Sequence, residues 1–215
     1  MNYARRLQLA PLLRKKSFFL LGPRSTGKTT LIRAQLGADA FIIDLLKSDN
    51  FLHLSNRPSD LGDMIRASGK EIVVIDEVQK LSSILDEVHR LIEETPTRFL
   101  LTGSSARKLR RGQANLLAGR AWQANLFPLV SAEIPQFDLT RYLTVGGLPQ
   151  VYGSTEPHEE LDAYVGTYLR EEIQAEGAVR NLARFGRFLT IAALTTGEVL
   201  NFTNVARDIG VSPST

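Results

Sequence analysis

The chain has 215 residues, of which 43% are hydrophobic and 23% charged, and its formal net charge is +3. This balance predicts a globular protein and excludes a disordered chain, and no apolar run approaches the roughly 20 residues that span a bilayer. Because the chain lacks cysteine, disulfides, thiolate metal sites and cysteine nucleophiles are excluded. We expect a cytoplasmic protein without a membrane partner, and the basic charge permits a nucleic-acid partner without requiring one.

The first predicted strand is the apolar run "SFFLL" at residues 17–21, which "GPRSTGKTT" and a helix-like segment follow. This stretch fits G-x-x-x-x-G-K-[ST], a phosphate-binding pattern when it joins a strand to a helix; that context disfavours an accidental glycine turn. Backbone N–H groups turn inward around an anion, and the helix N-terminus adds partial positive charge. We expect Lys28 to contact the β- and γ-phosphates of ATP and Thr29 to hold Mg²⁺. The predicted ATP-binding residues are Gly22, Pro23, Arg24, Ser25, Thr26, Gly27, Lys28, Thr29 and Thr30.

Two adjacent carboxylates end the third predicted strand. Apolar runs occupy residues 40–45 and 71–76, and the second run ends in Asp76, with Glu77 directly after it. Since ligands bind at the carboxyl ends of strands in open parallel sheets, we expect Asp76 to hold Mg²⁺ through its water shell and Glu77 to activate a water for attack on the γ-phosphate. A solvated acidic strand end is the alternative for this pair taken alone. Asp44, which closes the earlier run, is interpreted as a turn residue.

A helix and a fourth strand come next. Apolar residues at helical spacing predict a helix over residues 82–94, with a serine able to cap its start, and residues 98–102 form the next apolar run. Thr102 and Ser104 lie at the end of this run. There a hydroxyl can lie near the γ-phosphate or the attacking water, and an ordinary turn of Thr, Gly and Ser is the equal alternative.

Basic residues precede the last predicted strand, residues 121–127. A solvated loop is the favoured interpretation of the densest cluster, and a phosphate-backbone contact is the alternative. The cluster consists of Arg107, Lys108, Arg110 and Arg111. Arg120, directly before the strand, is a candidate arginine finger facing a neighbouring subunit's phosphates, or a partner of a surface carboxylate.

The chain changes character after Pro128. Before it, apolar runs alternate with helical segments, which predicts an α/β domain over residues 1–135 with helices on both faces of a parallel sheet. A connecting helical region is predicted over 136–200. Residues 201–215 are typical of a short helix and a turn at Gly210, the start of a helix-turn-helix. Because that motif is incomplete, we expect the chain to be a fragment of a longer protein.

Five stretches together carry a family resemblance: "LLGPRSTGKTTLI", "IVVIDEVQKL", "LLTGSSARKL", "LLAGRAWQANLFPL" and "VGGLPQVY". In this order and spacing the chain resembles the AAA-type P-loop ATPases of bacteria and archaea whose largely uncharacterised C-terminal part contains a winged-helix-like segment. The resemblance implies a P-loop NTPase sheet of strand order 5-1-4-3-2, Thr102 or Ser104 as a sensor, and Arg120 as the finger. It also implies that Gly147 and Pro149 couple the nucleotide site to the helices that follow.

These observations favour Mg²⁺-dependent ATP binding and hydrolysis, coupled to a conformational task that the sequence does not identify. The alternative is a nucleotide-controlled switch or DNA-binding module with slow or no turnover, which docks DNA or a protein through its C-terminal part. Self-association is expected if Arg120 completes a neighbour's site. A small-molecule kinase is disfavoured, because Glu77 supplies a base for water and no arginine-rich lid is evident. The choice of ATP over GTP rests on the resemblance.

Overall fold

A computed structural model describes residues 3–104, 117, 119–168, 182–199 and 201–212 of the chain. The chain divides into two compact units, Met1–Pro157 and His158–Thr215. The basic cluster at residues 107–111, which we interpreted as a solvated loop, lies outside the described residues.

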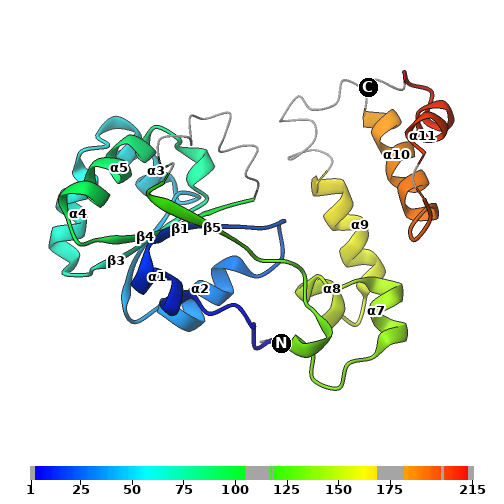
Figure 1. Cartoon of the computed structure of the whole chain (residues 1–215), viewed down its shortest axis with the longest axis horizontal. Helices are drawn as coiled ribbons and strands as arrows, with labels where there is room; N and C mark the ends of the chain where they lie inside the picture. The colour runs from blue at the N-terminus through cyan, green and yellow to red at the C-terminus, as the bar shows by residue number, and fades with distance from the viewer. Residues whose placement is uncertain (1–2, 105–116, 118, 169–181, 200, 213–215) are drawn as a thin grey trace. The chain divides into compact units, whose positions relative to one another are not determined.

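A five-stranded parallel sheet forms the centre of the first unit (Figure 1). The strands are β1 (Ser17–Leu21), β2 (Ala40–Asp44), β3 (Ile72–Asp76), β4 (Arg98–Gly103) and β5 (Ala121–Asn125). Their order is β2-β3-β4-β1-β5, which is the predicted order counted from the other edge. Because every pairing is parallel, the carboxyl ends of all five strands meet at one edge of the sheet. The predicted P-loop NTPase fold is confirmed.

Helices cover both faces of this sheet (Figure 1). One face carries α1 (Leu9–Lys15) and α2 (Lys28–Leu36), and the other carries α3 (Ser48–Asn56), α4 (Asp60–Ser68) and α5 (Ile84–Glu94). Successive strand residues serve opposite faces: Val73 and Ile75 belong to the core cluster under α3 to α5, whereas Val74 belongs to the cluster under α1 and α2. Burial on both faces explains why β1 to β4 are nearly continuous apolar runs, whereas the partly exposed edge strand β5 is more polar.

The predicted serine cap of α5 is wrong. Ser83 precedes the helix, but its side chain makes no capping hydrogen bond, and its backbone carbonyl accepts the N–H of Asp86 at 3.4 Å. The helix is stabilised instead by its apolar face, where Val88 and Leu91 are buried, and by Asp86 and Glu87 in its first turn.

Short elements complete the first unit after β5. These are the 3₁₀ turn η3 (Ser131–Glu133) and the helices α7 (Leu139–Val145) and α8 (Pro149–Gly153), and an earlier 3₁₀ turn, η1 (Val78–Lys80), follows β3. Pro149 is the first residue of α8, where its missing N–H leaves no bond unmade. The part of the connecting region within this unit therefore contains two helices, and its bounds at residues 136–200 stay a prediction.

The second unit is helical in its described part. Its elements are α9, which begins at the unit boundary (Pro157–Tyr168), α10 (Leu182–Leu194) and α11 (Phe202–Ile209). The Asn201 side chain caps α11 by accepting the N–H groups of Thr203 and Asn204 at 3.0 and 3.1 Å. Gly210 ends the helix at φ 72°, which confirms the predicted turn, while the winged helix stays a prediction. Among the described helices, none is long and apolar enough to cross a membrane.

Candidate functional site

The loop between β1 and α2 wraps back on itself at the carboxyl edge of the sheet. Gly22 must lack a side chain, because a Cβ there would lie 2.2 Å from the backbone carbonyl oxygen of Leu126. Ser25 and Gly27 both have left-handed backbones, with φ of 60° and 87°. Such a succession of unusual conformations is how a short loop turns several N–H groups toward one point. The sequence pattern therefore forms the expected strand-loop-helix arrangement.

Lys28 begins α2 with a side chain that folds over this loop. It is only 7% exposed, and its Nζ donates to the carbonyls of Gly22 at 2.7 Å and Pro23 at 3.0 Å. The hydroxyl of Thr26, which is fully buried, donates to the same Pro23 carbonyl at 2.8 Å. The ammonium group is thus held at the mouth of the loop. Thr30, in the same first helical turn, has an exposed side chain.

A network of hydroxyls and one carboxylate joins the ends of the loop, β3 and β4. Thr29 Oγ1 donates to Asp76 Oδ2 at 2.9 Å, and Thr102 Oγ1 donates to Asp76 Oδ1. Thr102 Oγ1 in turn accepts the backbone N–H of Glu77 at 3.0 Å. Asp76 is 4% exposed and Thr102 is fully buried. The structure thus brings together four of the residues that the sequence singled out.

Glu77 leaves the strand in a left-handed conformation, with φ 59°, which is uncommon for any residue but glycine. Its carboxylate accepts a hydrogen bond from the Gln79 amide, whose Oε1 is buried and has no hydrogen-bond partner within the described part of the chain. Ser104 Oγ, beyond the end of β4, is also buried and finds no partner among the described residues. Strained backbone and unsatisfied polar atoms gather at functional sites, and here both occur within a few residues of Asp76. Sequence reasoning missed Gln79.

Arg120 lies at the opposite edge of the sheet from the phosphate loop. Ser17 pairs with Ala121, so Arg120 stands at the amino ends of β1 and β5, about 20 Å from the loop at the strands' carboxyl ends. Its guanidinium pairs with Glu93. Within its own subunit Arg120 therefore cannot reach the loop, and a contact with a neighbouring subunit's phosphates stays a prediction. Asp44 Oδ1 accepts the N–H of Leu46 at 2.9 Å, the turn that we expected there.

Gly147, which the family resemblance implicated in coupling, contacts the segment after β5. Its carbonyl accepts the Leu129 N–H at 2.7 Å, and a Cβ on it would lie 2.6 Å from the Leu129 carbonyl oxygen and 2.7 Å from the Tyr142 hydroxyl. Only glycine therefore fits this crossing of chains. A coupling role for Gly147 and Pro149 stays a prediction.

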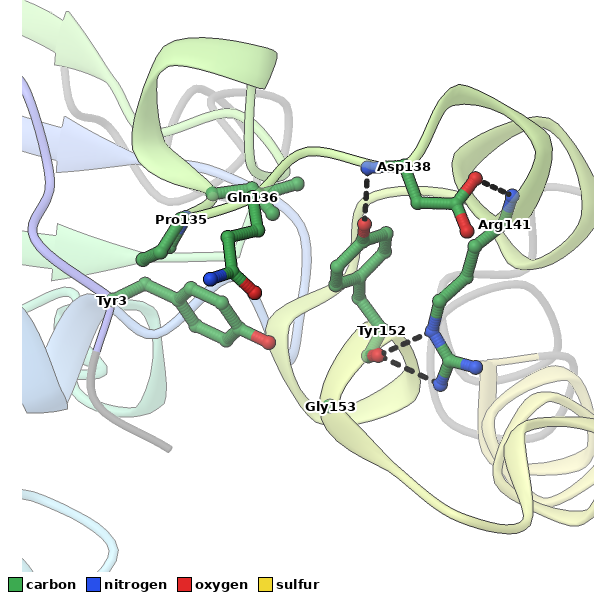
Figure 2. A pocket seen from close by; sticks show the side chains of 8 residues that line it. Tyr3, Pro135, Gln136, Asp138, Arg141, Tyr152 and Gly153 are labelled. Carbon is green, nitrogen blue, oxygen red and sulfur yellow. Dashed lines mark hydrogen bonds between the residues drawn. The ribbon is translucent and has the colours of Figure 1, made fainter.

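A pocket of about 490 Å³ lies beside the N-terminal segment (Figure 2). Its lining residues are Tyr3, Ile134, Pro135, Gln136, Asp138, Arg141, Tyr152 and Gly153. Arg141 donates to the Tyr152 carbonyl at 2.8 and 3.0 Å, and its guanidinium carbon lies 5.5 Å from the centre of the Tyr152 ring. Burial, followed by the neighbouring Tyr152, raises the pKa of Tyr3. No part of the phosphate-loop pattern pointed to this pocket.

Comparison with protein families assigns the first part of the chain. A model of the AAA domain family matches residues 14–135, more than half of the chain. The chain belongs to the AAA domain family. With its strand order and phosphate loop, this domain is a P-loop ATPase domain of the AAA type. Residues 136–215 match a family described as a domain of unknown function, and a search of curated proteins found no match.

Solved structures related to this AAA domain include two of low identity. A chain from a study of katanin self-assembly is 18% identical at a TM-score of 0.38; the match covers 53% of this chain and 41% of that chain. The Orc1 protein of Aeropyrum pernix in complex with DNA is 13% identical at a TM-score of 0.42; the match covers 94% of this chain and 73% of that chain. This chain thus spans less than half of the katanin chain.

Proposed function

We propose that this AAA domain binds ATP with Mg²⁺ and hydrolyses the bond to the γ-phosphate. The observation that carries the proposal is the network of Thr29, Asp76, Thr102 and Glu77, which joins the end of the phosphate loop to two strand ends. Buried carboxylates and hydroxyls in direct contact are the hard oxygen donors that Mg²⁺ takes, usually while it keeps several waters. The proposal is supported by the family, whose members are P-loop ATPases in general.

In this proposal the phosphates and Mg²⁺ are held by separate groups. The loop N–H groups and Lys28 hold the β- and γ-phosphates, and Lys28 exchanges its bonds to the Gly22 and Pro23 carbonyls for bonds to phosphate oxygens. Thr29 and Asp76 hold Mg²⁺, which when bound neutralises charge on the phosphates.

Glu77 acts as the base. Its carboxylate takes a proton from a water as the water oxygen bonds to the γ-phosphorus, while the bond from that phosphorus to the bridging oxygen breaks and ADP leaves with the electron pair. Thr102 accepts the Glu77 N–H and thereby holds the backbone from which this carboxylate extends. Ser104, whose buried hydroxyl has no hydrogen-bond partner among the residues that the structure describes, is proposed as the sensor of the γ-phosphate.

The test is Mg²⁺-dependent ATP turnover by the purified chain, measured beside ATP binding for Glu77→Gln and Lys28→Ala. Glu77→Gln should abolish turnover and keep ATP binding, because the amide cannot accept the proton. Lys28→Ala should weaken both. Turnover of Glu77→Gln at the parent rate would remove Glu77 as the base, and a parent that binds no ATP would refute the function.

Self-association and the C-terminal part are tested in the same assay. We propose that Arg120 contacts a neighbour's nucleotide, so the rate per chain should rise with protein concentration in the parent and stay flat in Arg120→Ala. Measuring the same rate with added DNA tests whether the capped helix α11 and the turn at Gly210 form a docking element. Tightly bound ATP with no turnover at any concentration, with or without DNA, would favour the nucleotide-controlled switch.

A further inference from the structure

Arg5, outside every motif in the sequence, makes a partly buried contact with the phosphate loop. Its Nη1 donates to the backbone carbonyl of Thr26 at 3.2 Å, and its Nη2 donates to the carbonyl of Phe127, just after β5. Its Nε lies 3.3 Å from Glu133 Oε1, an ion-pair contact without hydrogen-bond geometry. The side chains of Arg5 and Glu133 are 7% and 6% exposed. One guanidinium thus joins the N-terminal segment to the phosphate loop and to the segment that follows β5.

Glu133 is held as firmly as Arg5. Its Oε1 accepts the backbone N–H of Arg6 at 2.8 Å, and its Oε2 accepts the backbone N–H of Val130 at 3.2 Å. A buried ion pair offsets the loss of hydration only when further hydrogen bonds satisfy both groups in good geometry. Both groups of this pair make further hydrogen bonds, although Arg5 Nε itself makes none among the described residues.

The bond to the Thr26 carbonyl determines how the loop presents a donor. The carbonyl of Thr26 and the N–H of Gly27 belong to one planar trans peptide unit, so they point in opposite directions. Gly27 has φ 87° and no side chain, so it does not itself limit rotation of this peptide as another residue would. Arg5 supplies a restraint, because it holds the oxygen on one side and thereby directs the N–H to the other.

We propose that Arg5 is a positioning residue for the phosphate loop, held in place by Glu133, and that it keeps the Thr26–Gly27 peptide in its phosphate-binding orientation. The part of this inference that concerns nucleotide binding rests on the proposed function. It requires arginine: a guanidinium donates in several directions at once, whereas the single ammonium of lysine cannot reach both carbonyls and the carboxylate in the same geometry.

The chain offers a matched control in Arg6. It is the next residue, carries the same charge and has an exposed side chain, and its contact with Glu133 is made through the backbone N–H alone. Arg5→Lys and Arg6→Lys therefore make the same chemical change at neighbouring positions. Glu133→Gln is a second variant, which keeps the side-chain shape and removes the charge that holds Arg5.

The first measurement is hydrogen exchange of the amides of residues 22–30 without nucleotide. Arg5→Lys should raise their exchange rates about tenfold, because a hydrogen bond from a charged group is lost, while exchange in β1 and β4 stays unchanged. Arg6→Lys should leave the loop as it is, and Glu133→Gln should raise its exchange rates less than Arg5→Lys does. If Arg5→Lys does not fold, the loop exchange rates of Glu133→Gln and Arg6→Lys are compared instead, and a rise in Glu133→Gln alone supports the inference.

The second measurement is the affinity for fluorescent ADP at a temperature where each variant is folded. Arg5→Lys should weaken it about tenfold, with Arg6→Lys unchanged. Unchanged loop exchange in Arg5→Lys and Glu133→Gln would overturn the inference, and so would a rise that is uniform over the whole sheet, which a purely structural role gives. A parent that binds no ADP refutes the proposed function alone, because the exchange measurement still tests the restraint.

Discussion

Thr102→Val is the sharpest test of the network at the strand ends. The substitution keeps the shape of the side chain and removes one hydroxyl, which accepts the Glu77 N–H at 3.0 Å and donates to the Asp76 carboxylate. The bond to Asp76 is buried and the bond from the Glu77 N–H is partly buried, since Thr102 is fully buried and Asp76 is 4% exposed. Each buried group left unpaired costs about 1–3 kcal/mol, so the two together should lower the free energy of unfolding by about 3 kcal/mol.

Thr102→Ser is the matched control, because it keeps the hydroxyl and removes only a methyl group, at about 1 kcal/mol. Urea unfolding can be followed by the fluorescence of Trp122, the single tryptophan of the chain, which lies on β5 of the same sheet. The valine variant should unfold at lower urea concentration than the serine variant. If it is as stable as the serine variant or more so, the two hydrogen bonds do not contribute as argued here.

Three further predictions concern the glycines of the phosphate loop, Gln79 and Tyr3. Gly22→Ala should cost about 3 kcal/mol, because its Cβ would meet a backbone carbonyl at 2.2 Å, whereas Gly27→Ala, with only its φ of 87° to strain, should cost about 1 kcal/mol; equal urea midpoints would contradict this. Gln79→Ala should slow ATP turnover about tenfold at unchanged ADP affinity, because the Glu77 carboxylate loses the amide that orients it; an unchanged rate would exclude that role. Burial raises the pKa of Tyr3, so its neutral form contributes stability that is present below its ordinary pKa of 10.0 and lost as the pH rises above it. The free energy of unfolding should therefore fall more from about pH 9 to pH 11 in the parent than in Tyr3→Phe.

The sheet could be predicted because its signal is local. The strands β1 to β4 are short, mostly buried apolar runs, and each of these runs ends at a glycine, a carboxylate or a turn that the sequence displays; β5 is more polar and partly exposed. The signal for the phosphate loop is equally local, because the contacts of Gly22, Gly27 and Lys28 lie within six residues along the chain. The exception is the close approach of Gly22 to Leu126. The order of the strands is not local, and the family resemblance supplied it.

The parts that sequence reasoning missed depend on contacts with backbone atoms. Arg5 binds two carbonyls more than 20 and 120 residues away, and Glu133 binds two N–H groups. Every residue but proline offers both groups, so no pattern of residue types marks their partners. The serine cap of α5 failed for a related reason: whether a side chain reaches a free N–H depends on backbone angles, and Ser83 lies in the α region instead of the extended one.

At Glu77 the sequence predicted the residue type but not the left-handed backbone conformation. The motif placed an acidic residue after Asp76, but a strand that continued straight would leave its N–H in the plane of the sheet and its side chain on one face of the sheet. The turn at φ 59° is unfavourable for glutamate, and it persists because the N–H has a buried acceptor in Thr102 and the side chain a donor in Gln79. Thr102 thus has two tasks, since its hydroxyl also holds Asp76. The proposed base and the proposed metal ligand are therefore fixed by one side chain on the next strand, which makes the end of β4 part of the site even before a nucleotide is considered.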